Sequence, residues 1–459
     1  MRICRFLTIL LTSLTMSIVS SAQSVTGDWQ GTLNVGSISL RLVFHISGEN
    51  GQYKATMDSP DQGAKGIPID DIKVQEQQIT LTISQLMVKY NGTITADSLI
   101  AGTFTQGGVS SPLTLKRTVV RINRPQNPQP PYPYRSEEIT FRNEQASINL
   151  AGTLTLPAEG GPFTAVILLT GSGTQDRDET IMEHKPFLVI ADYLTRHGIA
   201  VLRFDDRGAG RSEGNPTTAT TADFATDAEA ALDYLKQRKE INASRIGFLG
   251  HSEGGCIAFH VAGKRKDVAF VVSLAGTGLP GDSILLYQNH IMARTLQMPE
   301  ETWEAQNDML KKIYDIAKSE LSDKEAARMI VEAGKSVLPS TPAPEQTEVL
   351  KKQAQAITLP WMRYFLKYDP RTDLAKMHCH LLALNGEKDM QVEAEANLKA
   401  IKEASKSENG RRITIMQYPG LNHLFQHCQT EMVNEYARIE ETISPEVLND
   451  ITTWINSLF

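Results

Sequence analysis

A serine near the middle of the chain stands in a pattern that is typical of a nucleophile. Residues 250–255 have the sequence GHSEGG, so Ser252 has glycine two positions before it and two positions after it, and an apolar run precedes it. A sharp turn from a strand into a helix exposes such a serine, and the glycines let the helix approach the strand without Cβ clashes. We therefore predict a strand that ends at Gly250, a helix that starts after Ser252, and nucleophilic chemistry at the Ser252 hydroxyl.

A serine hydroxyl becomes a good nucleophile only beside a base that accepts its proton and an acid that orients the base. Asp389 follows the apolar run 381–384, and His423 follows the apolar run 412–418. The carboxyl ends of neighbouring parallel strands lie at one edge of a sheet, where ligands bind. We therefore predict that Ser252 is the nucleophile, His423 the base and Asp389 the acid that holds the imidazole.

Other residues compete for two of these roles. His427 is an alternative base, although it falls where we expect the following helix to have begun. Glu387 and Asp373 are alternative acids. His251, which directly precedes the nucleophile, is expected to be its structural neighbour.

The loop after the third predicted strand of this region is rich in glycine and charge. Backbone N–H groups in such a loop stabilise the oxyanion of an acyl-transfer reaction. We predict that the N–H groups of Glu253 and Ser172 form the oxyanion hole, with Gly173 as the alternative to Ser172. We expect the charged run Asp176–Glu179 to anchor this loop through salt bridges, and contact with substrate is the alternative.

Two histidines flank a cysteine further along the chain. His378 and His380 have the spacing of residues on one face of a strand and could resemble a pair of metal ligands. No further ligand stands near them in a recognised pattern, so we predict neither a metal nor another cofactor. A disulfide between Cys379 and Cys428 stays open, because the sequence says nothing about the Cα separation that a disulfide requires.

The elements that must position these residues alternate between strand and helix patterns from residue 136 to residue 459. The later strands are almost continuously apolar, which is typical of parallel strands that are buried on both faces. We predict an eight-stranded, mostly parallel sheet with an antiparallel start and helices on both faces. The predicted strands are 139–141, 150–156, 165–170, 199–204, 245–250, 269–274, 380–384 and 412–418, and the predicted helices are 187–196, 224–239, 256–263, 394–405 and 445–458.

One stretch, residues 279–376, interrupts this alternation. It contains no strand pattern, and helical periodicity is clear at 300–318 and 323–333. Helices inserted between two strands of such a sheet are expected to form a cap over the carboxyl ends of the strands. We therefore predict a helical cap that shapes the substrate pocket.

Residues 23–120 have a different character. Apolar residues alternate with other residues at 38–46 and 79–83, and turn signals separate the runs. This pattern predicts an antiparallel β domain, a small barrel or sandwich, with Trp29 in its core. The proline-rich segment 121–135 is predicted to be an extended linker, because proline disfavours helix interiors and central strands.

Residues 1–22 are predicted to be a signal peptide. They start with positive charge, continue with an apolar run at 6–19 and end with small residues, so we expect cleavage near Ala22 and a secreted or periplasmic chain. The alternative is an N-terminal membrane anchor. Because the apolar run is short and contains polar residues, we expect no stable membrane insertion.

Composition and charge limit the class of partner. The chain has 459 residues, of which 41% are hydrophobic, so it is long enough for two domains. With 46 basic and 53 acidic residues its formal net charge is -7, which does not favour nucleic acid. We expect a small-molecule or short-peptide acyl substrate, and a homodimer stays open.

Four segments carry a resemblance to a known family. Residues 137–459 resemble the α/β-hydrolase superfamily, and in particular the bacterial capped serine carboxylesterases, which border on the serine aminopeptidase-like hydrolases. The similar segments are Thr170–Glu179, Phe204–Ser212, Gly250–Gly255 and Pro360–Pro370. The resemblance implies an α/β-hydrolase fold, an acyl-enzyme mechanism and a cap that shapes the acyl pocket.

Function is predicted from the motifs and the resemblance together. We expect a serine hydrolase that cleaves carboxylic esters of small or medium acyl groups. Two alternatives stay open, a serine peptidase that acts on short peptides and a binding module whose hydrolase is vestigial. Thr170 and Gly171 stand where many esterases have His-Gly, which leaves the second oxyanion donor open.

Overall fold

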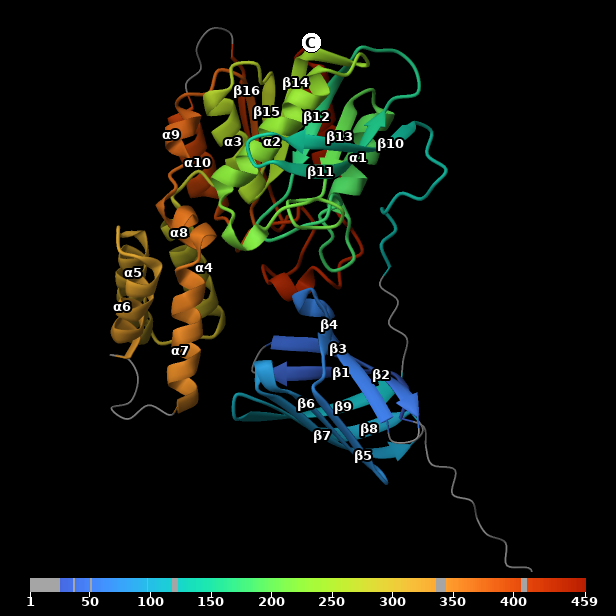
Figure 1. The fold of residues 1–459 in the computed structure, drawn as a ribbon, viewed down its shortest axis with the longest axis vertical. Helices are drawn as coiled ribbons and strands as arrows, with labels where there is room; N and C mark the ends of the chain where they lie inside the picture. The colour runs from blue at the N-terminus through green and yellow to red at the C-terminus, as the bar shows by residue number, and fades with distance from the viewer. Residues whose placement is uncertain are drawn as a thin grey trace, which may run out of the picture. The chain divides into compact units, whose positions relative to one another are not determined.

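The computed structural model describes residues 25–35, 38–49, 52–96, 98–117, 123–335, 344–405 and 411–459. The predicted signal peptide lies outside the described residues. Within the described residues, the chain divides into an N-terminal unit that contains strands β1–β9 and a C-terminal unit that contains strands β10–β17 and the α-helices (Figure 1).

The N-terminal unit is a nine-stranded antiparallel sheet with the strand order β4-β3-β2-β1-β9-β8-β7-β6-β5. The edge strands β4 and β5 are joined by Ile69 and Asp70. The Ile69 N–H donates to Ala55 O on β3 and the Asp70 N–H donates to Thr82 O on β6, so this connection links the two ends of the sheet. The strands are β1 (Gly27–Val35), β2 (Ile38–Glu49), β3 (Gln52–Ser59), β4 (Ala64–Pro68), β5 (Asp71–Gln75), β6 (Gln78–Ile83), β7 (Val88–Ala96), β8 (Leu99–Gln106) and β9 (Val109–Arg117), with a short 3-10 turn η2 (Ser84–Leu86). The 3-10 turn η1 (Pro60–Gln62), between β3 and β4 in the sequence, is grouped with the C-terminal unit.

Aromatic side chains form the centre of this sheet's core. Trp29 is 1% exposed and donates its indole N–H to Val25 O over 2.7 Å. Phe44 and Tyr90 are buried beside it and stack with their ring centroids 5.8 Å apart. The predicted core position of Trp29 is confirmed.

The proline-rich segment belongs with the C-terminal unit over its described part. Arg124 donates to the carbonyl oxygens of Ala437 and Ile439, both over 2.9 Å, and the Tyr134 hydroxyl donates to Asp192 over 2.9 Å. Proline removes backbone donors, so side chains attach this extended segment. The segment that we predicted as a linker is therefore held along the C-terminal unit from residue 123 onward.

The C-terminal unit is built on an eight-stranded sheet with the order β10-β11-β13-β12-β14-β15-β16-β17. The pairs β10–β11 and β11–β13 are antiparallel, and the other five neighbouring pairs are parallel. The strands are β10 (Arg135–Asn143), β11 (Ile148–Leu156), β12 (Phe163–Leu169), β13 (Ala200–Phe204), β14 (Ile241–His251), β15 (Phe270–Leu274), β16 (His380–Gly386) and β17 (Ile413–Tyr418).

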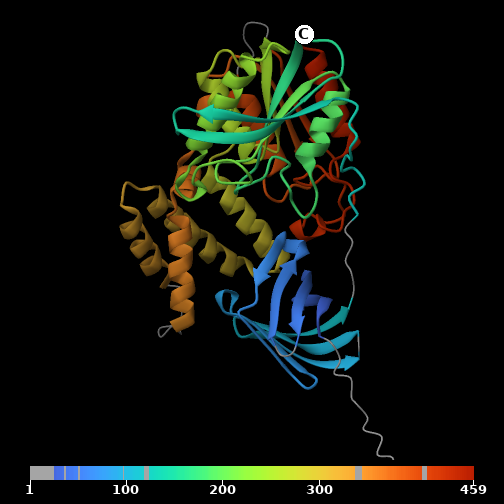
Figure 2. The same ribbon diagram turned by 45° about the vertical axis from the view of Figure 1, so that its right-hand side comes forward.

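Helices cover both faces of this sheet, as Figure 2 shows from a second side. Along β12, Ala165 and Ile167 belong to the core beneath one set of helices, while Val166 and Leu168 belong to the opposite core. Successive side chains of a strand point to opposite faces, so a strand that is covered on both faces must be apolar at every position. The first set is α2 (Thr221–Lys236), α3 (Glu253–Lys264) and α10 (Ala394–Ala404), and the second is α1 (Pro186–Arg196) and α11 (Pro445–Asn456).

The described part of the segment between β15 and β16 consists of α-helices joined by loops and contains no strand. Ile313, Tyr314, Ile330 and Leu366 form a separate small core there. The helices are α4 (Gly281–Thr295), α5 (Glu300–Lys318), α6 (Asp323–Lys335), α7 (Pro344–Ile357), α8 (Pro360–Lys367) and α9 (Arg371–Leu374), and the remaining 3-10 turns of the unit are η3 (Pro216–Thr218) and η4 (Val433–Glu435). We call helices α4–α9 the cap.

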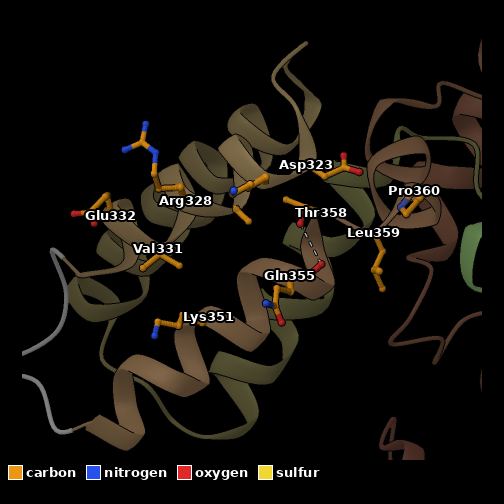
Figure 3. A pocket seen from close by; sticks show the side chains of 11 residues that line it. Asp323, Arg328, Val331, Glu332, Lys351, Gln355, Thr358, Leu359 and Pro360 are labelled. Atoms are coloured by element: carbon orange, nitrogen blue, oxygen red, sulfur yellow. Dashed lines mark hydrogen bonds between the residues drawn. The ribbon is translucent and has the colours of Figure 1, made fainter.

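The cap contains an open groove between α6 and α7 (Figure 3). Its volume is about 620 Å³, and it ends at Leu359 and Pro360, directly before α8. Val331 and Ala327 on α6 give it an apolar wall, and Gln355 and Lys351 lie on the α7 side. None of the residues that line it belongs to the predicted triad.

Candidate active site

Ser252 lies at the tip of a tight turn between β14 and α3. Its backbone has φ 53° and ψ −117°, a strained conformation for a residue with a Cβ. A Cβ on Gly250 would lie 2.1 Å from the backbone of Gly254, and a Cβ on Gly254 would lie 2.0 Å from Leu169 O. Only glycine fits at these positions, and the Ser252 N–H donates to Leu274 O over 2.8 Å, which fixes the turn on the end of β15.

His423 and Asp389 form a buried hydrogen-bonded pair. His423 Nδ1 lies 2.7 Å from Asp389 Oδ2, and the two side chains are 4% and 0% exposed. Asp389 Oδ1 accepts the N–H groups of Gln391 and Val392 over 2.8 and 2.9 Å. An ionised carboxylate only accepts hydrogen bonds, so His423 donates from Nδ1 and its Nε2 is left as the basic nitrogen.

Contacts around His251 join His423 to the turn at Ser252. The ring centroids of His251 and His423 are 4.8 Å apart, and His251 Nε2 lies 3.1 Å from His423 O. His251 Nδ1 lies 2.9 Å from Glu179 Oε1. The predicted role of His251 as a structural neighbour of Ser252 is confirmed.

The glycine-rich loop after β12 lies against the same turn. A Cβ on Gly171 would lie 3.4 Å from Ser252 Cβ, but the Gly171 N–H is already bonded to Glu179 Oε1 over 2.7 Å. Ser172 follows it and is exposed. Glu253 is the first residue of α3, so its N–H has no acceptor within the helix.

Salt bridges anchor this loop to the sheet, as predicted for its charged run. Arg177 pairs with Asp205 over 2.7 Å and with Glu138 over 2.8 Å. Asp178 pairs with Arg203 and, over 3.1 Å, with Lys185.

One acidic residue near the loop was missed by the sequence analysis. Asp206 is buried and accepts the Thr170 hydroxyl over 2.8 Å and the Gln175 N–H over 2.9 Å. Burial raises the pKa of Asp206 to about 7. Its position just after the apolar strand β13, inside one of the four similar segments, was the signal that could have revealed it.

The alternative base is engaged elsewhere. His427 has 64% of its side chain exposed and pairs with Glu441 over 2.9 Å. It forms a bridge with Leu421 in an irregular segment, and α11 begins only at Pro445. Our expectation that His427 falls inside a helix was wrong, because this segment is held by side-chain hydrogen bonds such as that of His427 N–H to Glu441.

The alternative acids are also engaged elsewhere. Asp373 accepts hydrogen bonds from His260 over 2.8 Å and from the Tyr368 hydroxyl over 2.9 Å. Glu387 accepts the Gly420 N–H over 3.0 Å. Of the three acids considered, Asp389 is the one that contacts His423.

Neither a metal site nor a disulfide forms at the remaining sequence candidates within the described residues. His380 Nδ1 accepts the Arg412 N–H over 3.0 Å. Cys379 and Cys428 are free thiols. Within the described residues, no three His, Cys, Asp or Glu side chains are grouped so as to hold a metal ion, and no helix has the length and apolar character needed to cross a membrane.

Two cap helices contact this region directly. Trp361 Nε1 on α8 donates to Glu253 Oε1 over 2.8 Å, and the Thr221 hydroxyl donates to the same oxygen over 2.6 Å. Gln288 Nε2 on α4 donates to Gln391 O in the Asp389 loop over 3.0 Å. The role of Trp361 was missed because it depends on a contact across 108 residues of sequence.

Sequence comparison identifies the family. The profile of the family described as "Serine aminopeptidase, S33" matches residues 183–427, more than half of the chain. The chain belongs to this family of α/β hydrolases. The superfamily resemblance drawn from the motifs is therefore confirmed, and the chain is a hydrolase.

Individual relatives of this hydrolase include one named esterase. Esterase EstD of Thermotoga maritima is 28% identical over 321 residues, which cover 69% of this chain and 68% of EstD. The uncharacterized protein YfhR of Salmonella typhimurium is 31% identical over 125 residues, 27% of this chain and 40% of YfhR. Among solved structures, the hypothetical protein PA2218 of Pseudomonas aeruginosa has a TM-score of 0.45 and 16% identity, and the match covers 74% of this chain and 100% of PA2218.

Proposed function

We propose that this hydrolase is a serine carboxylesterase that cleaves esters of small or medium acyl groups. The observation that carries the proposal is the buried 2.7 Å hydrogen bond between His423 and Asp389 beside the strained turn at Ser252. Such a pair is the arrangement that activates a serine for acyl transfer. The similarity to EstD, an esterase by name, favours esters over other acyl substrates.

The proposed reaction proceeds through an acyl-enzyme. His423 Nε2 takes the proton of Ser252 as Ser252 Oγ attacks the ester carbonyl carbon, and Asp389 stabilises the imidazolium. The N–H groups of Glu253 and Ser172 donate to the tetrahedral oxyanion. The intermediate expels the alcohol, which receives the proton from His423. Water then attacks the acyl-enzyme with His423 again as base, and the carboxylic acid and the free Ser252 hydroxyl are released.

Replacing the nucleophile tests this proposal. Ser252→Ala is expected to lower kcat for p-nitrophenyl acetate by about a million-fold, as loss of the serine does in other triads. Ser244→Ala is the matched control, because Ser244 is an exposed serine on the same strand, β14. The control is expected to keep its turnover, and wild-type turnover in Ser252→Ala would refute the proposal.

Peptidase activity is the second candidate, and the family description favours it. Binding the N-terminus of a peptide would require acidic groups in the pocket. The acidic residues of α5 that the sequence offers, Glu300, Glu301, Glu304 and Asp308, are all exposed, and Asp308 pairs with Lys311. We expect p-nitrophenyl esters to have a higher kcat/KM than aminoacyl anilides, and the reverse order would support the peptidase.

A binding module with a vestigial hydrolase is the third candidate. In that case the N-terminal β unit would carry the function and Ser252 would be unreactive. A fluorophosphonate probe labels only an activated serine, so labelling of the wild type contradicts this candidate.

A further inference from the structure

A second histidine–carboxylate pair lies directly behind the proposed triad. His251 and Glu179 are 5% and 1% exposed, and Glu179 has a positive φ of 51°. Neither side chain transfers a proton in the proposed reaction. Burial of an ionisable group costs free energy unless hydrogen bonds or an opposite charge stabilise it.

The partners of His251 determine how many protons its ring carries. Nε2 lies 3.1 Å from the carbonyl oxygen of His423, and a carbonyl oxygen only accepts hydrogen bonds. Nε2 must therefore carry a hydrogen. Nδ1 lies 2.9 Å from Glu179 Oε1, which also accepts the Gly171 N–H over 2.7 Å. An ionised Glu179 only accepts hydrogen bonds, so its contact with Nδ1 places a hydrogen on Nδ1 as well.

We propose that His251 is a buried imidazolium paired with ionised Glu179, and that this pair positions the oxyanion loop and the His423 loop. The positioning role rests on the proposed function, whereas the protonation state does not. Glu179 connects the two loops because one of its oxygens bonds to Gly171, directly before the proposed donor Ser172, and to His251, which bonds to the backbone of His423.

The charges around His251 agree with this assignment. The groups that face it are Glu179, Asp389 and the His423 ring, 4.8 Å away. Burial lowers the pKa of His251, but the charge and hydrogen bond of Glu179, the His423 carbonyl and Asp389 together raise it above its ordinary value of 6.5. In the proposed reaction the His423 ring becomes positively charged. The negative charge of Glu179 offsets the positive charge of His251, so His251 does not repel the His423 imidazolium.

Glu179→Gln tests the positioning role. The amide oxygen can still accept the Gly171 N–H, so the change removes the charge while preserving the shape of the side chain. We expect kcat for p-nitrophenyl acetate to fall by between about tenfold and the 100-fold that loss of a whole oxyanion donor causes, with KM within about twofold. A fall in kcat with little change in KM indicates that Glu179 positions groups that act in the transition state. Loss of folded protein alone would leave the kcat of the remaining active sites unchanged.

Asp373→Asn is the matched control. It neutralises another buried carboxylate that is bonded to a histidine, His260, over 2.8 Å. We expect both variants to lose thermal stability and only Glu179→Gln to lose kcat. Wild-type kcat in Glu179→Gln, or an equal loss in the two variants, would overturn the positioning role.

The protonation state can be measured without reference to catalysis. In wild type labelled with 15N-histidine, both ring nitrogens of His251 are expected to be mostly protonated at pH 6.5, and one is expected to lose its proton in Glu179→Gln, where burial lowers the pKa of His251 without the opposing charge of Glu179. The resonances are assigned by their loss in His251→Gln or His251→Asn. An unprotonated ring nitrogen of His251 in the wild type would overturn the imidazolium. Absence of ester turnover in the wild type would overturn the proposed function and leave the NMR result standing.

Discussion

A hydrogen bond joins α8 of the cap to α3, the helix that follows Ser252. Trp361 Nε1 and the Thr221 hydroxyl both donate to Glu253 Oε1, over 2.8 and 2.6 Å. Trp361→Phe removes the first donor and keeps an aromatic ring beside Phe365, which stacks on Trp361 with centroids 5.4 Å apart. The variant therefore tests the hydrogen bond with little change in packing.

The size of the effect depends on the charge of Glu253. A hydrogen bond to a charged group contributes about 1.5–3 kcal/mol, and because Thr221 still donates we expect a loss of about 1.5 kcal/mol in the free energy of unfolding at pH 8. Burial raises the pKa of Glu253 above 4.5, while Thr221 and Trp361 lower it. Removing Trp361 raises this folded-state pKa further, so the destabilisation is largest where Glu253 is ionised and shrinks as the pH falls towards 4.5.

Urea unfolding at pH 8 and pH 5 measures this difference. Trp454→Phe is the control, because Trp454 is also a buried tryptophan and its indole N–H donates to the neutral Thr414 hydroxyl over 3.0 Å. We expect its destabilisation to be independent of pH. Since the Glu253 N–H is a proposed oxyanion donor, we also expect kcat of Trp361→Phe to fall about tenfold, which corresponds to about 1.4 kcal/mol. Equal losses at both pH values, or no loss at pH 8, would refute the reasoning.

Asp389, Asp206 and the N-terminus provide further tests. Asp389→Asn is expected to lower kcat for p-nitrophenyl acetate about 10⁴-fold, because the asparagine favours the wrong tautomer of His423, and unchanged kcat would contradict this role. Burial raises the pKa of Asp206 to about 7 from 3.8, so wild-type stability falls as the pH rises from about 4 to 7. The melting temperature of Asp206→Asn should not show this fall over the same pH range. A pH dependence of the melting temperature equal to that of the wild type would contradict the prediction. Mass spectrometry of the chain exported by a bacterial host is expected to find a mature N-terminus at Gln23, and a retained Met1 would contradict a cleaved signal peptide.

The strands of the C-terminal sheet could be predicted because their signal is local. Residues 165–169 are apolar at every position, and the structure has helices on both faces of that strand, β12. The turn at Ser252 could be predicted for the same reason, because the glycines that indicate it lie within two or three residues of Ser252. In the cap, α5 has the bounds expected from its periodicity, Glu300–Lys318.

Features that depend on contacts between distant residues could not be predicted in the same way. Glu179 is 72 residues from His251, and His251 is 172 residues from the carbonyl group that it contacts. The attachment of Arg124 to Ala437 spans 313 residues, so the proline-rich composition indicated an extended segment and gave no sign of the surface along which it lies. Such contacts follow from the topology of the sheet, which places the carboxyl ends of β12, β14 and β16 at one edge.

The central claim is that Ser252 is an activated nucleophile. Its most direct test is to treat the wild-type protein with a fluorophosphonate and to locate the adduct by peptide mapping. We predict a single adduct on Ser252 that is absent from Ser252→Ala and greatly slowed in Asp389→Asn. An adduct on another residue, or no adduct on a folded wild-type protein, would contradict the account.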